Sequence, residues 1–160
     1  MLLAALLLQA VPPPPVRRAE CYRTEVRGSL TVRSYLGDRA CIALSQPQVM
    51  EGIWLRAFEG SEFHEGARTR HDIRSSAGKP WFETAEPLKP FVDPLPPQEI
   101  YAGRLYRVRF VGRRSIAQNQ PPMEGFGHMG GSPSLVLLDE LLSIEDLGPL
   151  TPRKRADQLR

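Results

Sequence analysis

The side chains that could hold a metal ion are few and widely spaced. They are the three histidines and two neighbouring carboxylates: His64, Glu65, His71, Asp72 and His128. Zinc in proteins takes three or four such ligands, but the H-E-x-x-H spacing of zinc hydrolases is absent here. A metal-dependent hydrolase that uses His64, His71 and His128 is therefore only an alternative. The prediction is no metal and no cofactor.

Catalytic motifs for nucleophilic attack or for nucleotide binding are also incomplete. Ser132 lies in Gly-Gly-Ser-Pro-Ser, which breaks the G-x-S-x-G pattern of hydrolases at its last position. Residues 125–130 match the G-x-G-x-x-G of dinucleotide sites, but the prolines on both sides leave no flanking strand and helix. We interpret residues 125–130 as a glycine-rich loop and expect a protein without enzymatic activity.

Arginines mark the candidate binding surface. The formal net charge is +3, and most of the 21 basic residues are arginines. In segments that alternate apolar and polar residues, the polar positions include Arg33, Arg107 and Arg109. We therefore expect these arginines on the solvent face of a sheet, near a loop that carries His128. Such a face suits an anionic ligand, or else its arginines are merely solvated and paired with glutamates. The charge forms no basic stripe, so no nucleic acid is expected as a partner.

Two cysteines, Cys21 and Cys41, predict one disulfide. An even count favours pairing wherever the compartment is oxidising. Two reduced buried thiols or a pair of metal ligands are the alternatives. Neither residue belongs to a C-x-x-C motif, so redox catalysis lacks its usual spacing.

The first fifteen residues indicate the compartment. Residues 2–8 are uncharged and apolar, and four prolines follow at 12–15. Seven such residues are too few to span a bilayer, which needs about 20, but they suit the apolar region of an export signal. No Lys or Arg precedes them, so a disordered N-terminus is the alternative. We expect an exported protein, periplasmic or secreted, with no transmembrane segment in the mature chain.

Alternating apolar and polar residues predict a mainly β fold. Strands are expected at 26–33, 40–44, 53–58, 100–111 and 135–142, and the first two are expected to form a hairpin around Gly37-Asp38. In the fourth strand Tyr106, Val108 and Phe110 should point inward, and Arg107 and Arg109 outward. The last run also fits a helix.

The connections are expected to be long. Residues 62–98 are rich in charge and proline and predict a long ordered loop, and Ser143 to Asp146 resembles the capping box of a helical turn. About five short strands with a long loop and short helical turns predict a small OB-like Greek-key barrel. The expected parts are an export signal and Pro-rich linker at 1–19, the barrel at 20–148, and a disordered basic tail at 149–160.

A succession of short segments resembles a family of small exported OB-like domains of Gram-negative bacteria, which is largely uncharacterised. The segments are Cys21-Tyr22, 27–33, 106–112, 127–130 and 135–139. The resemblance covers residues 21–147 and departs from the family at His128-Met129, where consecutive histidines are common. It implies export and a barrel, and no particular reaction.

These observations predict an exported, non-catalytic binding module of the bacterial envelope. Its ligand is unknown, and an anionic or polar envelope component or an envelope protein is expected. The residues expected to bind it are Arg33, Arg107, Arg109 and His128. Besides the hydrolase, a structural or assembly factor of the envelope remains an alternative.

Overall fold

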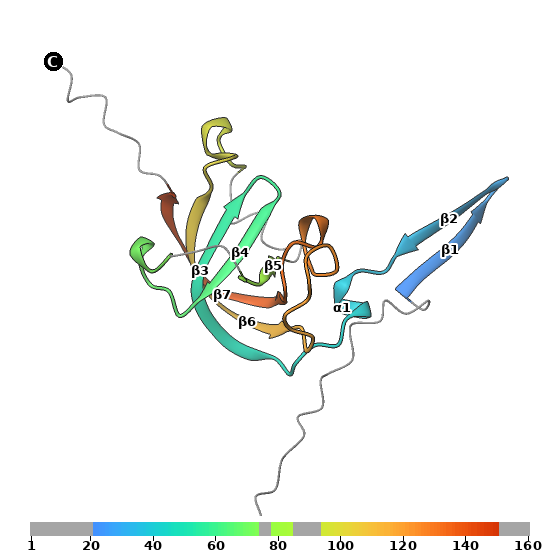
Figure 1. Ribbon diagram of the computed structural model, residues 1–160, viewed down its shortest axis with the longest axis horizontal. Coiled ribbons are helices and arrows are strands. Elements are labelled where there is room, and N and C mark those ends of the chain that lie inside the picture. The colour runs from blue at the N-terminus through green and yellow to red at the C-terminus, as the bar shows by residue number, and fades with distance from the viewer. Residues whose placement is uncertain (1–20, 74–77, 85–93, 151–160) are drawn as a thin grey trace, which may run out of the picture. The chain divides into compact units, whose positions relative to one another are not determined.

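The computed structural model describes residues 21–73, 78–84 and 94–150, whose elements are shown in Figure 1. The chain forms two compact units that meet in the sequence between Ala43 and Leu44. The barrel domain expected at 20–148 therefore divides into a hairpin unit and a barrel unit. The predicted export signal and linker at 1–19 lie outside the described residues, as do residues 151–160 of the predicted tail. None of the described helices is long and apolar enough to cross a membrane.

The first unit is a hairpin followed by one helical turn. Its elements are β1 (Tyr22–Arg27), β2 (Leu30–Tyr35) and α1 (Asp38–Cys41). The prediction of one strand at 26–33 and a second at 40–44 is wrong, because the chain turns at Gly28-Ser29. Gly28 has a φ of 63°, which favours a two-residue hairpin turn. A turn this short leaves an alternating sequence pattern uninterrupted, so the pattern did not show it.

The second unit is a five-stranded OB-like barrel. Its strands are β3 (Gln48–Ala57), β4 (Gly60–Glu65), β5 (Trp81–Glu83), β6 (Arg104–Arg114) and β7 (Leu135–Pro149). The pairings run β3-β4-β5-β7-β6 and return to β3, and all are antiparallel except that of β5 with β7. The link from β4 to β5 is thin, since it consists of the single pair Glu62 and Trp81. The predicted mainly β Greek-key barrel is confirmed.

Two connections differ from the prediction. The run at 135–142 is a strand, but the expected helical turn at 143–146 is wrong, because these residues continue β7 and pair with β6. Hydrogen bonding of residues 143–146 to the long strand β6 outweighs the local preference of the capping-box sequence for a helical turn. Pro149 ends β7 and the Leu150 N–H donates to the Gly103 carbonyl at 2.9 Å, so two residues of the predicted tail are ordered. The expected loop at 62–98 contains the end of β4, all of β5 and the short turns η2 (Arg70–Asp72) and η4 (Pro97–Glu99).

The barrel is packed on both sides of β3. The interior core contains Met50, Trp54, Phe63, Phe82, Tyr106, Val108, Phe110, Val136 and Leu138. A second cluster, on the outer face, contains Ile53, Leu55, Ala67 and Leu105. The alternation predicted for β6 is confirmed, since Val108 and Phe110 are fully buried while Arg109 is exposed. This double packing fixes the barrel wall that carries the surface described next.

Candidate functional site

Trp81 lies at the centre of the candidate site, on the outer surface of β5. Its neighbour Phe82 points into the core and is 1% exposed, so the alternation of the strand turns Trp81 outward. The indole Nε1–H donates to Glu83 Oε2 at 3.0 Å, and the backbone N–H donates to the Ser134 carbonyl at 2.9 Å. These two bonds fix the indole between β5 and the start of β7.

Gly127, in the connection between β6 and β7, packs on the Trp81 ring. A Cβ placed on Gly127 would lie 2.1 Å from two ring carbons, and the φ of this residue is 72°. Both facts require glycine here, because other residues would clash with the ring and strain the backbone. The 125–130 segment is thus a loop between the last two strands, as predicted, and it packs on the indole. In Figure 1 this connection runs beside β5.

Two adjoining hollows flank Trp81, and together they form what we call the Trp81 groove. Both are lined by Trp81, by Glu59 of the turn that joins β3 to β4, and by the first two residues of β4, Gly60 and Ser61. One has a volume of about 390 Å³ and is also lined by Lys79, His128 and Ser132. The other has a volume of about 300 Å³ and is also lined by Arg56 and Glu83. The groove therefore lies across β4 and β5, between the β3–β4 turn and the β6–β7 connection.

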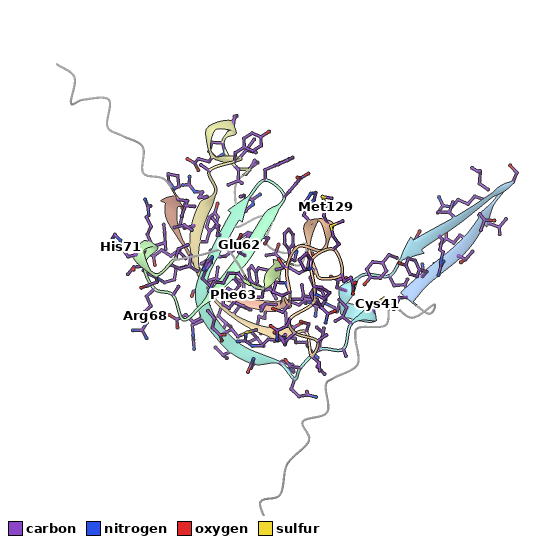
Figure 2. All side chains as sticks on the ribbon, viewed as in Figure 1. Cys41, Glu62, Phe63, Arg68, His71 and Met129 are labelled. Carbon is purple, nitrogen blue, oxygen red and sulfur yellow. The ribbon has the colours of Figure 1, made fainter. Side chains whose placement is uncertain are left out.

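Charged side chains border the groove on opposite sides. His128 Nε2 lies 3.2 Å from Glu59 Oε2, so a protonated His128 pairs with the β3–β4 turn across the groove. Glu62, labelled on β4 in Figure 2, and Glu83 add two carboxylates, while Lys79 adds a cation. The groove thus combines a half-buried aromatic ring with carboxylate acceptors and with donors on Arg56, Lys79, His128 and Ser132.

A short chain of hydrogen bonds supports the wall behind the groove. The Trp54 indole N–H donates to Ser61 Oγ at 3.0 Å, and the Ser61 hydroxyl donates to the Phe82 carbonyl at 2.5 Å. The Phe63 N–H also donates to the Pro80 carbonyl at 3.1 Å. These bonds hold β4 against β5 where strand pairing is limited to one residue pair. They therefore fix the positions of the two strands that form the base of the groove.

The arginines that the sequence singled out belong to two different units of the chain. Arg107 and Arg109 both point outward from β6, but Arg107 is engaged by the Glu145 carboxylate and by the Arg68 carbonyl. Arg109 is exposed on the same strand. Arg33 belongs to the hairpin unit, where its guanidinium lies 4.2 Å from the centre of the Tyr22 ring. Of the four predicted ligand-binding residues only His128 lines the Trp81 groove, and binding by the three arginines stays a prediction.

The three histidines do not assemble a metal site. His64 is buried on β4 with Nε2 3.3 Å from Glu62 Oε2, His71 is exposed in η2, and His128 lies by Glu59. Within residues 21–73, 78–84 and 94–150, no three His, Cys, Asp or Glu side chains are placed to hold a metal ion. The hydrolase alternative thus has no metal-binding cluster in this part of the chain.

Cys21 and Cys41 lie together in the hairpin unit. They are 2.7 Å apart and unbonded, and the Cys41 thiol donates to the Cys21 carbonyl. Burial raises the pKa of Cys41, and the neighbouring Cys21 raises it further. Burial also raises the pKa of Tyr35, whose hydroxyl donates to Asp38 Oδ1 at 2.8 Å. The two thiols are therefore adjacent, as the predicted disulfide requires.

Sequence reasoning missed most of the groove. Trp81 and Glu83 belong to a strand of three residues, which is too short for an alternating pattern to be recognised. Glu59 lies in a tight turn with a φ of 53°, and nothing in its sequence context indicates a site. The one usable signal was the glycine-rich segment beside His128, because glycine is needed where backbone packs closely on a ring.

Comparison with known protein families, with curated proteins and with solved structures finds no match to this chain.

Proposed function

We propose that the chain is an exported, non-catalytic binding module whose ligand occupies the Trp81 groove. One observation carries the proposal: an outward indole, bordered by carboxylates, lies on β4 and β5 between the β3–β4 turn and the β6–β7 connection. In OB barrels, ligands lie on the second and third strands of the barrel and on the loops that border them. The position of the groove matches that surface.

The side chains favour a hydroxyl-rich ligand, such as a glycan of the bacterial envelope. The carboxylates of Glu59, Glu62 and Glu83 accept hydrogen bonds from hydroxyl groups, and the indole of Trp81 offers an apolar surface for a sugar ring. These three carboxylates outnumber the two fixed cations of the groove, Arg56 and Lys79, which disfavours phosphate groups and therefore a nucleic acid. Of the two ligand classes predicted from the sequence, an anionic or a polar envelope component, the groove therefore favours the polar one.

The adjacent cysteines support the export part of the proposal. In an oxidising compartment the two thiols of Cys21 and Cys41 lose two protons and pass two electrons to the disulfide of an exchange partner, and the S–S bond forms. By the chain-entropy model a bridge that closes a loop of this length stabilises the fold by about 3 kcal/mol. The hairpin unit has little apolar core of its own, so this contribution matters there.

Fractionation of the native host tests compartment and bridge together. We expect the periplasmic or secreted fraction to contain a shortened chain, whose mass rises by about two hydrogens after reduction. A full-length chain in the cytosol with both thiols free contradicts export and the disulfide.

Tryptophan fluorescence tests the ligand class, since the chain has two tryptophans and Trp54 is buried. Soluble peptidoglycan fragments and lipopolysaccharide core oligosaccharides serve as probes. A change in emission that saturates with one of them supports the proposal if isothermal titration calorimetry, which does not rely on Trp81 emission, shows that Trp81→Phe binds the same probe more weakly. Tyr101→Phe is the matched control, because Tyr101 is 82% exposed and does not line the groove. No response to any probe rules out the sugar ligands tested.

A further inference from the structure

The hairpin unit leaves both edges of its sheet unpaired among the described residues. β1 and β2 pair only with each other, without a bulge, and neither contains proline. All six residues of β2 are exposed, and Val26 on β1 is 74% exposed. A two-stranded hairpin is at best marginally stable alone, and a regular edge is a template for another strand. The unit is therefore built to accept at least one more strand.

We propose that a second copy of this chain supplies that strand, through antiparallel pairing of β1 with β1 about a twofold axis at Thr24. In this register Arg23 of each copy lies opposite Glu25 of the other, which gives two ion pairs. Tyr22 of each copy lies opposite Val26 of the other and covers its exposed side chain. The product is a four-stranded sheet, and a sheet needs at least three strands to be stable on its own.

The charged side chains of β1 are exposed and, among the described residues, have partners only within their own strand. Glu25 Oε2 accepts from Arg27 at 2.9 Å, whereas Arg23 approaches Glu25 only to 4.0 Å and its side chain is 68% exposed. Arg23 thus has a weak partner within its own strand. Opposite a second β1, its guanidinium gains a carboxylate directly across the ladder, at the distance where cross-strand pairs interact.

Other registers are less favourable. An axis at Glu25 places Arg23 opposite Arg27 and the two glutamates opposite each other, and an axis at Arg23 opposes two arginines. Like charges directly opposite destabilise a ladder. The β2 edge carries one charged residue, Arg33, and so offers no ion pair between copies. An axis at Val26 also sets Glu25 opposite Arg27, but it pairs only residues 25–27 of β1, whereas the Thr24 axis pairs residues 22–26. Charge complementarity and the length of pairing together therefore select the β1 edge and the Thr24 register.

Sedimentation of the full chain tests this dimer with a pair of charge reversals. The wild type is expected to show a concentration-dependent equilibrium between monomer and dimer. Arg23→Glu sets two glutamates against each other across the ladder, and Glu25→Arg sets two arginines, so each variant alone should dimerise about tenfold more weakly. An equimolar mixture of the two variants should regain wild-type association, because every cross-copy pair is then of opposite charge. Arg109→Glu, the same charge change on the barrel, should dimerise like the wild type.

The mixing step separates loss of pairing from loss of folding, since two misfolded variants cannot restore each other. The double variant Arg23→Glu with Glu25→Arg should also dimerise. A wild type that stays monomeric, single reversals that dimerise normally, or a mixture that stays monomeric would each overturn the proposal. The result does not depend on the Trp81 groove, which lies in the other unit.

Discussion

At the scale of single residues, the groove depends on glycine where a backbone packs on a ring. Gly127 touches the Trp81 indole so closely that even a methyl group has no room. Trp81 in turn is oriented by Glu83. The groove is therefore sensitive to one residue that contributes no side chain of its own.

Gly127→Ala should lower the free energy of unfolding by about 2–3 kcal/mol, because it adds a clash to a backbone with positive φ. Urea unfolding measures the loss, and a shift in Trp81 emission reports the displaced ring. Gly131→Ala is the matched control, since its Cβ would meet only the His128 carbonyl at 3.4 Å. Equal stability of the two variants would contradict the packing of Gly127 on Trp81.

Asp146 makes the barrel sensitive to acid. Burial alone would raise its pKa, but hydrogen bonds from the Arg104 guanidinium and the Gly148 N–H outweigh burial and lower it. Because the folded pKa lies below the unfolded value of about 3.9, the stabilisation is complete above that value and is lost as the pH falls through the folded one. Arg104 also bonds the buried carboxylate of Glu99, so the pair belongs to a network.

Asp146→Asn should therefore be less stable than the wild type at neutral pH and lose less of its stability between pH 5 and strongly acidic pH. Urea unfolding at a series of pH values measures how the free energy of unfolding of each protein changes with pH. Parallel pH curves for the two proteins would show that Asp146 does not contribute this dependence.

At the scale of elements, β5 is the shortest strand of the barrel and the one with the least pairing to a neighbour. It has three residues, joins β4 through one pair and pairs with β7 over those same three residues, so its inward Phe82 is its main side-chain anchor in the core. The Phe82 ring contacts those of Trp54, Phe63 and Phe110. Besides the strand pairing and the hydrogen bonds to β4, this buried ring therefore anchors the wall that carries the groove.

Phe82→Ala should cost about 3–5 kcal/mol of unfolding free energy, as large-to-small core changes do. It should also speed amide exchange at Trp81 more than in the long β6–β7 ladder, because β5 has few other contacts. Val136→Ala, in the same core on β7, is the comparison. Uniform exchange in both variants would contradict the special weakness of β5.

The long strands could be predicted from the sequence and the short elements could not. Strand β6 shows its faces through Tyr106, Val108 and Phe110, since an eleven-residue strand repeats the alternation many times. The hairpin turn at Gly28 and the strand at Trp81 are each a few residues long and leave no period to recognise. For the site, His128 was predicted and Trp81 was not, because its role arises from the pairing of β5 with β7.

At the scale of the whole molecule, we assign a different role to each of the two units. We propose that the barrel unit binds a hydroxyl-rich ligand in the Trp81 groove and that the hairpin unit joins two copies of the chain.

Backbone chemical-shift mapping tests the central claim most directly. The ¹⁵N-labelled protein is titrated with the glycan fragment that changes the tryptophan emission. We expect the largest shifts at residues 59–61, 81–83 and 127–132, which line or support the Trp81 groove. Shifts centred instead on Arg107 and Arg109 of β6, or on Arg33 of the hairpin, would contradict the central claim.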